Sequence, residues 1–279
     1  MKYIIAAFAS LACASPLMAE DKADMELWRI DCGTIEISDT APFSDAHLYD
    51  GEERSMVVSC YLIRNGDQYF LWDAGLPGAL KGANLTQGVF TLNVTSTISE
   101  QLADLGLSND EIDLLGISHY HFDHVGQAAD FPSAKLVINR LDYEAMVNQT
   151  ADASVAGNAE VFAPWTGEDA SETVLFSKDH DVFDDGTVSI VGTPGHTPGH
   201  SALLVRMPET GRLLFTGDLY HFEEHVPNRG VPHFNTDRAD TLASFERFNA
   251  IAESLDAKVI IQHDPRHLDR LPVFPESAK

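Results

Sequence analysis

The sequence predicts one domain of mixed α/β structure, because it contains both short apolar strands and helical segments. With 279 residues, 44% of them hydrophobic, the chain can bury one large core. The expected strands are 25–30, 34–37, 57–63, 68–72, 112–118, 187–191, 213–218 and 258–263. The expected helices are 97–105, 139–147 and 236–255.

Local signals support these elements. The Asn65-Gly66 dipeptide favours a tight turn, so strands 57–63 and 68–72 should form a hairpin. The last helix carries a mostly apolar face at a helical period, which indicates packing on the core. This face consists of Leu242, Phe245, Phe248, Asn249 and Ala252.

The run His119-Tyr120-His121-Phe122-Asp123-His124 directly follows the apolar strand 112–118. Alternate residues of an extended segment point the same way, so His119 and His121 can hold one ion. Asp123 and His124 then turn towards a second ion. Imidazole combined with carboxylate suits zinc, iron, manganese or cobalt rather than a purely hard cation.

Other strand ends carry the same residue types. Glycine and proline in Thr193-Pro194-Gly195-His196-Thr197-Pro198-Gly199-His200 force a tight loop that can present His196. Strand 213–218 ends in Asp218, and strand 258–263 ends in His263. Several ligands on separate strand ends, with a carboxylate to share, predict a dinuclear metal site.

This order of motifs resembles the metallo-β-lactamase superfamily: a His-x-His-x-Asp-His run, a Gly-His loop, a Gly-Asp strand end and a final His. The resemblance implies a four-layer αβ/βα sandwich, with the site at one edge between two sheets. It covers the single metallo-hydrolase domain expected over residues 20–279.

The resemblance also implies roles for individual residues. His119, His121 and His196 would hold the first metal, Asp123, His124 and His263 the second, and Asp218 would bridge. Asp73, in Trp72-Asp73-Ala74-Gly75, matches the superfamily's early Asp and would fix the tautomer of a ligand histidine. An ordinary turn aspartate is the alternative there. His200 is interpreted as a packed or supporting histidine.

Within the superfamily, Ser118-His119-Tyr120-His121-Phe122-Asp123-His124-Val125-Gly126 resembles the N-acyl homoserine lactonase group. We therefore expect a dinuclear metal-dependent hydrolase, with zinc as the expected metal, that opens these lactones in quorum quenching. That group often has a tyrosine three residues after the bridging Asp, where this chain has His221, preceded by Tyr220. Either side chain could bind the substrate oxygen. The candidate catalytic residues are Asp123, Tyr220 and His221.

Two long linkers, 75–96 and 148–172, carry apolar side chains and are interpreted as lids over the acyl chain of the substrate. For Phe90, packing within its own loop or against a second subunit is the alternative. The sequence is compatible with a homodimer. The expected pocket residues are Phe90, Phe122, Phe162, Trp165 and Phe234.

Other activities of the same fold remain as alternatives. A metallo-β-lactamase is one, although such enzymes generally lack a carboxylate at the position of Asp218. A broad esterase or lactonase is another. A glyoxalase-like thioesterase is disfavoured because the chain has no basic C-terminal segment. A non-enzymatic binding scaffold is disfavoured because every ligand position is filled.

The formal net charge is −25 at pH 7. Such an acidic surface repels nucleic acid and anionic membranes, so neither is an expected partner, and it favours a small neutral substrate. Residues 1–19 resemble a bacterial secretory signal, which predicts a periplasmic or secreted protein. Without that segment, Cys32 and Cys60 are the remaining cysteines, and they form either a disulfide or two buried thiols.

Overall fold

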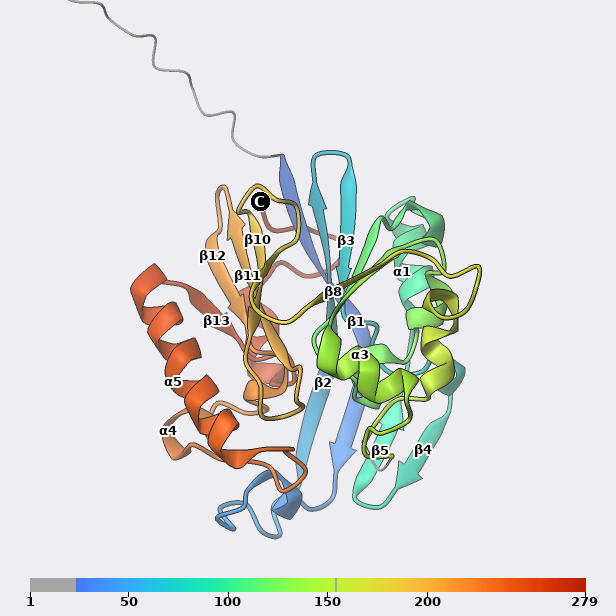
Figure 1. Cartoon of the computed structure of the whole chain (residues 1–279). Helices are drawn as coiled ribbons and strands as arrows, with labels where there is room; N and C mark the ends of the chain where they lie inside the picture. The colour runs from blue at the N-terminus through green and yellow to red at the C-terminus, as the bar shows by residue number, and fades with distance from the viewer. Residues whose placement is uncertain (1–23, 154) are drawn as a thin grey trace, which may run out of the picture.

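Two β-sheets pack face to face in the computed structural model, which describes residues 24–153 and 155–279 (Figure 1). The predicted signal segment, 1–19, lies outside the described residues. The larger sheet has the strand order β4-β5-β1-β2-β3-β6-β7-β8, and the smaller has β13-β12-β11-β10-β9. The strands of the larger sheet are β1 (Met25–Ile37), β2 (Arg54–Asn65), β3 (Gln68–Trp72), β4 (Asn84–Gln87), β5 (Phe90–Asn93), β6 (Leu114–Ile117), β7 (Lys135–Asn139) and β8 (Thr173–Phe176).

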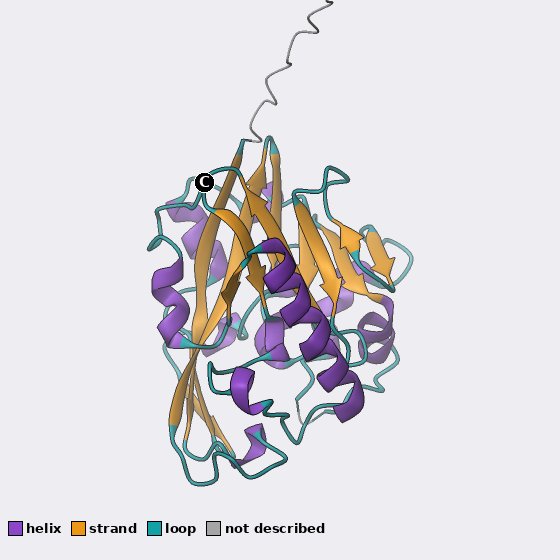
Figure 2. Cartoon of the chain, turned by 90° about the vertical axis from the view of Figure 1, so that its left-hand side faces the viewer, coloured by secondary structure: helices purple, strands orange, loops and turns teal. Residues whose placement is uncertain are grey.

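Helices cover the outer face of each sheet, which completes the predicted four-layer sandwich. The long helix α5 lies across the smaller sheet, and α1 and α3 lie on the opposite side of the molecule (Figures 1 and 2). The smaller sheet consists of β9 (His180–Asp181), β10 (Val188–Gly192), β11 (Ser201–Met207), β12 (Gly211–Phe215) and β13 (Lys258–Ile260). The helices are α1 (Ile98–Asp104), α2 (Phe122–Val125), α3 (Arg140–Val147), α4 (His225–Asn228) and α5 (Arg238–Leu255).

The alternation of side chains along the strands divides the core into three clusters. Tyr61 of β2 joins the cluster between the two sheets, whereas the next residue, Leu62, joins the cluster under α1 and α3. Phe245 and Phe248 of α5 pack on Leu204 and Leu214 of the smaller sheet in the third cluster. The central strands of both sheets are therefore apolar on both faces, as expected for the middle layers of a sandwich.

Two expectations about local structure are corrected. Segments 25–30 and 34–37, predicted as separate strands, form the one strand β1, because a register shift between Asp31 and Thr34 absorbs Gly33. The linker 75–96 is not a free loop, since its hairpin β4–β5 extends the larger sheet by pairing with the end of β1.

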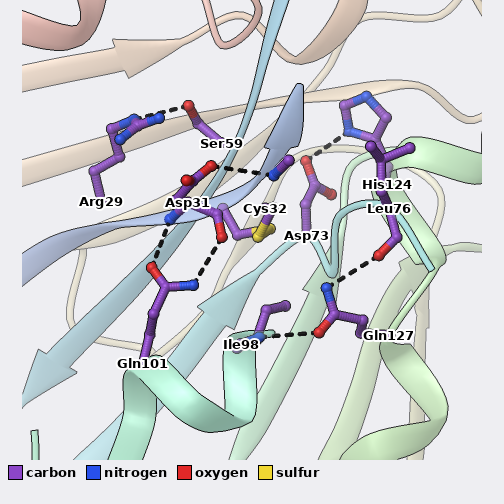
Figure 3. Close-up of a disulfide and its surroundings, with 12 residues drawn as sticks. Arg29, Asp31, Cys32, Ser59, Asp73, Leu76, Ile98, Gln101, His124 and Gln127 are labelled. Carbon is purple, nitrogen blue, oxygen red and sulfur yellow. Dashed lines mark hydrogen bonds and ion pairs between the residues drawn. A yellow bond between two sulfur atoms is a disulfide. The ribbon is translucent and has the colours of Figure 1, made fainter. Parts of the chain in front are cut away.

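The two cysteines form a disulfide. Cys32 of β1 and Cys60 of β2 are joined beside the segment Asp73–Leu76, which Figure 3 shows with its neighbours. Both residues are fully buried in the cluster under α1. The sequence left a disulfide and free thiols as equal alternatives, and the structure selects the disulfide.

Parallel pairing brings the ligand-bearing strand ends together. Strands β3 and β6 run parallel in the larger sheet, and β12 and β13 run parallel in the smaller. The carboxyl ends of parallel strands meet at one edge of a sheet. Asp73, His119, Asp218 and His263 all follow these ends and so converge between the sheets. Among the described residues, no helix is long and apolar enough to span a bilayer.

Candidate metal centre

The predicted ligands form two adjacent buried groups. His119, His121, His196 and Asp218 make one group, and Asp123, His124 and His263 make the other. Within each group, the potential ligand atoms all lie within 4.8 Å of one another. Each group therefore has the side chains and the spacing to surround one cation.

Asp218 stands between the two groups. Its Oδ1 lies 3.0 Å from Nε2 of His124 and 2.8 Å from Nε2 of His263. Its Oδ2 lies 3.2 Å from Nε2 of His196 and 3.6 Å from Nε2 of His119. One carboxylate oxygen thus faces each group, which is the arrangement that a bridging ligand needs.

The ligand histidines are held by their other ring nitrogen. For His119, His124, His196 and His263, Nδ1 contacts an oxygen atom at 2.8–3.0 Å, so each presents Nε2 to the centre. His121 is the exception, because its Nδ1 faces His196 Nε2 at 2.9 Å. Such contacts fix ring orientation and tautomer before a metal binds. The oxygen partners are Ser118 Oγ, Asp73 Oδ2, Asn235 Oδ1 and the Val57 carbonyl.

The chemistry of the donor set fits two divalent cations. Within the described chain, His119 Nε2 is buried and has no hydrogen-bond partner, although it faces Asp218. Burial, and then the neighbouring histidines, hold the pKa of His119 and of His121 well below its usual value, so both rings are neutral near pH 7. Neutral imidazole is the form that binds metal.

The two histidines of the second group are more basic than those of the first. Burial lowers the pKa of His124, but Asp218, Asp123 and Asp73 together raise it well above its usual value. At His263, burial lowers the pKa and Asp218 raises it, and the net shift of the pKa is again upward. A cation in this group replaces those protons, so metal binding there releases protons and weakens as pH falls.

Asp73 lies behind His124 rather than among the ligands. Its Oδ2 accepts hydrogen bonds from Nδ1 of His124 at 2.9 Å and from Oγ of Ser118 at 3.0 Å. Its Oδ1 accepts one from the backbone N–H of Ser118 at 2.7 Å. The left-handed backbone of Asp73 (φ 63°) turns the chain sharply after β3 and aims the carboxylate at the centre.

His200 supports the bridging residue. Its Nε2 accepts a hydrogen bond from the backbone N–H of Asp218 at 2.9 Å, and its Nδ1 lies 2.9 Å from the carbonyl oxygen of Thr193. Burial lowers the pKa of His200 to about 3, so the ring stays neutral and can accept this bond. A side chain at Gly217 would meet the His200 ring at 2.6 Å, so this position requires glycine.

An apolar pocket opens beside the ligands. Among the predicted pocket residues, Phe90, Phe122 and Phe234 line it, together with Asp123 and His121 of the centre. Other lining residues were not predicted, because strand pairing brings them in from distant segments: Ile35 lies opposite Met56 across β1 and β2. These residues are Ile35, Phe43 and Met56, and Val155 of the predicted lid 148–172 lines the pocket as well.

Phe162 and Trp165 do not line this pocket, which corrects the prediction. They lie in the short 3₁₀ helix Ala159–Trp165 and are buried in the core under α3. The indole N–H of Trp165 donates to the Ala134 carbonyl at 2.7 Å. Both side chains therefore stabilise the fold, because their burial holds the helix Ala159–Trp165 against the larger sheet.

The structure separates Tyr220 from His221. The ring of Tyr220 stacks on Phe245 of α5, and its hydroxyl accepts a hydrogen bond from Asn249 at 3.0 Å. Tyr220 therefore faces away from the centre. His221 lies in the pocket wall, with Nε2 at 3.1 Å from Asp218 Oδ2.

The sequence matches the family model described as "Metallo-beta-lactamase superfamily" over residues 55–263. The chain is 31% identical over 175 residues to the N-acyl homoserine lactonase AttM of Rhizobium radiobacter, a match covering 60% of this chain and 63% of that protein. The chain thus spans less than two thirds of that relative's length. A second AttM, from Rhizobium johnstonii, is 27% identical over 91% of this chain and 98% of its own length.

Solved structures share the fold. An N-acyl homoserine lactone hydrolase with the product N-hexanoyl-L-homoserine bound at its catalytic metal centre superimposes with a TM-score of 0.77, at 23% identity, over 91% of this chain and 98% of that chain. AidC, a dizinc quorum-quenching lactonase, gives a TM-score of 0.65 at 16% identity, over 92% and 90%. At these identities the likeness establishes the four-layer fold.

We predict that Asp218→Asn gives a folded protein with lower metal content. The neutral amide cannot offset the charge of two cations, so metal affinity should fall by at least about 100-fold, the upper end of what loss of a supporting contact costs. Metal analysis after dialysis measures this. Asp67→Asn, in the exposed β2–β3 turn at the far end of β3, is the matched control. Full occupancy in Asp218→Asn would show that Asp218 is not the bridge.

Proposed function

The chain belongs to the metallo-beta-lactamase superfamily, and we propose that it is a dinuclear metal-dependent lactonase that opens N-acyl homoserine lactones. The observation that carries this proposal is Asp218, whose two oxygens face two separate ligand groups beside an apolar pocket. Relatives named N-acyl homoserine lactonase, including one matched over 98% of its length, support the substrate class.

Two bound cations would activate a water as nucleophile and polarise the lactone carbonyl. His119, His121 and His196 would hold one cation, Asp123, His124 and His263 the other, and Asp218 both. The apolar walls of the pocket exclude water and bind the acyl chain, so the lactone ring comes to lie at the polar end. Product release then requires the acyl chain to leave the same pocket.

His221 supplies a hydrogen bond at the polar end of the pocket. Burial lowers the pKa of His221 to about 4 against the opposing effect of Asp218, so the ring is neutral near pH 7 and carries one N–H. Its Nδ1 is buried and has no partner within the described residues, so the N–H that can serve the pocket is the one on Nε2, which faces Asp218 Oδ2 at 3.1 Å. We propose that this Nε2–H is shared between Asp218 and the lactone oxygen, in the position where many lactonases have tyrosine.

Zinc is the proposed metal, because the centre is rich in imidazole and every ligand is a nitrogen or carboxylate oxygen. A periplasmic or secreted location is also part of the proposal. The Cys32–Cys60 disulfide supports it, since disulfides persist in oxidising compartments, and so does the resemblance of residues 1–19 to a secretory signal. The net charge of −25 favours a neutral lactone over an anionic substrate.

Assay of the metal-loaded protein on acylated homoserine lactones and on a chromogenic cephalosporin tests the proposal directly. We expect lactone opening with a kcat/KM at least about 100-fold above that for the cephalosporin. The reason is that the pocket binds an acyl chain, and Asp218 stands where metallo-β-lactamases generally lack a carboxylate. Turnover of the cephalosporin at an equal or higher kcat/KM would instead make the chain a metallo-β-lactamase. Hydrolysis of simple esters with no preference for lactones would make it a broad esterase.

Substitutions at neighbouring positions test the role of His221. His221→Phe should lower kcat/KM for lactones by about 10-fold or more, because one hydrogen bond to a developing charge is lost. Tyr220→Phe should change it by less than about 2-fold, since the Tyr220 hydroxyl binds Asn249 outside the centre. Steady-state kinetics with both variants measure the difference. A larger loss in Tyr220→Phe than in His221→Phe would contradict the placement.

Phe90 should determine the preference for acyl length. Each buried methylene contributes about 0.8 kcal/mol, so kcat/KM should rise a few-fold per carbon until the pocket is full. Phe90→Ala should weaken long-chain lactones much more than short ones. Leu85→Ala, on the same hairpin but 38% exposed and outside the pocket, is the control. An equal loss across chain lengths in Phe90→Ala would show that Phe90 only packs on the fold.

A further inference from the structure

Gln262 is a buried amide that contacts both sides of the centre without being a ligand. It directly precedes the ligand His263, and only 1% of its surface is exposed. Its Oε1 accepts hydrogen bonds from the backbone N–H of Gly217 at 3.0 Å and from the indole of Trp72 at 3.3 Å. Its Nε2 donates to Asp73 Oδ2 at 3.1 Å and to the carbonyl of Ser59 at 3.4 Å.

These contacts reach one carboxylate and one turn that matter for metal binding. Asp73 holds Nδ1 of His124, and Gly217 is the residue before Asp218. The partners of Gln262 come from β2, β3 and the end of β12, so one side chain ties the larger sheet to the smaller one at the metal edge. The ligand His124 also joins Asp73 to Asp218 through its two ring nitrogens, whereas Gln262 links Asp73 to this turn from outside the ligand set.

We propose that Gln262 is a positioning residue for the second metal, setting Asp73 and the Asp218 turn in register with each other. The proposal rests on the dinuclear centre and not on the identity of the substrate. As an uncharged amide, Gln262 can both accept from Gly217 and donate to the Asp73 carboxylate. A glutamate would place a second negative charge beside Asp73, and an apolar side chain would leave both contacts unmade.

Gln101 offers a matched control. It is also a buried amide (5% exposed) that bonds at both ends, since it accepts from the N–H of Asp31 and donates to the carbonyls of Asp31 and Thr97. It lies on α1, and Figure 3 shows it bonded to Asp31 on the far side of the disulfide from His124. Gln101→Met therefore removes a similar set of contacts away from the metal ligands.

The test is metal binding by the metal-free protein, measured by competition with a chelating dye of known zinc affinity, with no substrate present. Gln262→Met should lower the affinity for the second zinc ion by about 10–100-fold and that for the first by much less. Gln262→Glu, which keeps the contact to Gly217 but loses the donor to Asp73, should lose at least as much. Gln101→Met should leave both affinities within about 2-fold.

Cobalt-loaded protein gives a second readout, because a displaced His124 alters the visible spectrum of the metal in its site. Equal affinity losses in Gln262→Met and Gln101→Met, or unchanged affinity in both Gln262 variants, would reduce Gln262 to a packing residue. Because no lactone enters the experiment, loss of the lactonase proposal would leave this inference standing. If Gln262→Met does not fold, the Gln262→Glu comparison decides alone.

Discussion

The position of one buried carboxylate, that of Asp218, constrains the rest of the metal centre. A carboxylate with so little contact with water is stable only when paired, and here four histidines from three segments of the chain surround it. These interactions outweigh burial and keep the pKa of Asp218 well below its usual value, so the residue is ionised. The ligands of both cations are thus arranged around a fixed negative charge.

Backbone contacts of the smaller sheet fix the position of the Asp218 carboxylate. Parallel pairing of Phe215 with Ile260 sets β12 level with β13, so Asp218 and His263 leave the smaller sheet at the same height. His200 then holds the N–H of Asp218, and Gly217 leaves room for the His200 ring. Since these supports belong to the sheet edge, the packing of the protein itself positions the bridging carboxylate.

The metal ligands could be identified from the sequence for one physical reason, and their order carried the family resemblance that implied the four-layer fold. Each ligand follows an apolar strand and lies near glycine or proline, so strand, turn and ligand are all encoded within a few residues. The pocket depends instead on contacts between distant segments. Phe43 and Met56 belong to stretches without a motif, and β1–β2 pairing brings Met56 beside Ile35.

The side-chain direction of Tyr220 and His221 could not be read from the sequence either, because both residues follow a short 3₁₀ turn, Gly217–Leu219, where no simple period holds. The same limit applies to Phe162 and Trp165, whose apolar character fits a lid and a core equally well. Their burial against Ala134 and α3 shows that both side chains belong to the core. That burial depends on tertiary packing, which the local sequence does not reveal.

Crystallographic location of the metals by anomalous scattering would test whether Asp218 bridges them. We expect two cations about 3.5–4 Å apart, with one carboxylate oxygen of Asp218 bound to each. A single cation held by His119, His121 and His196, with Asp218 unbound, would contradict it. So would two cations that both bind the same oxygen of a different residue and leave Asp218 outside the coordination shell.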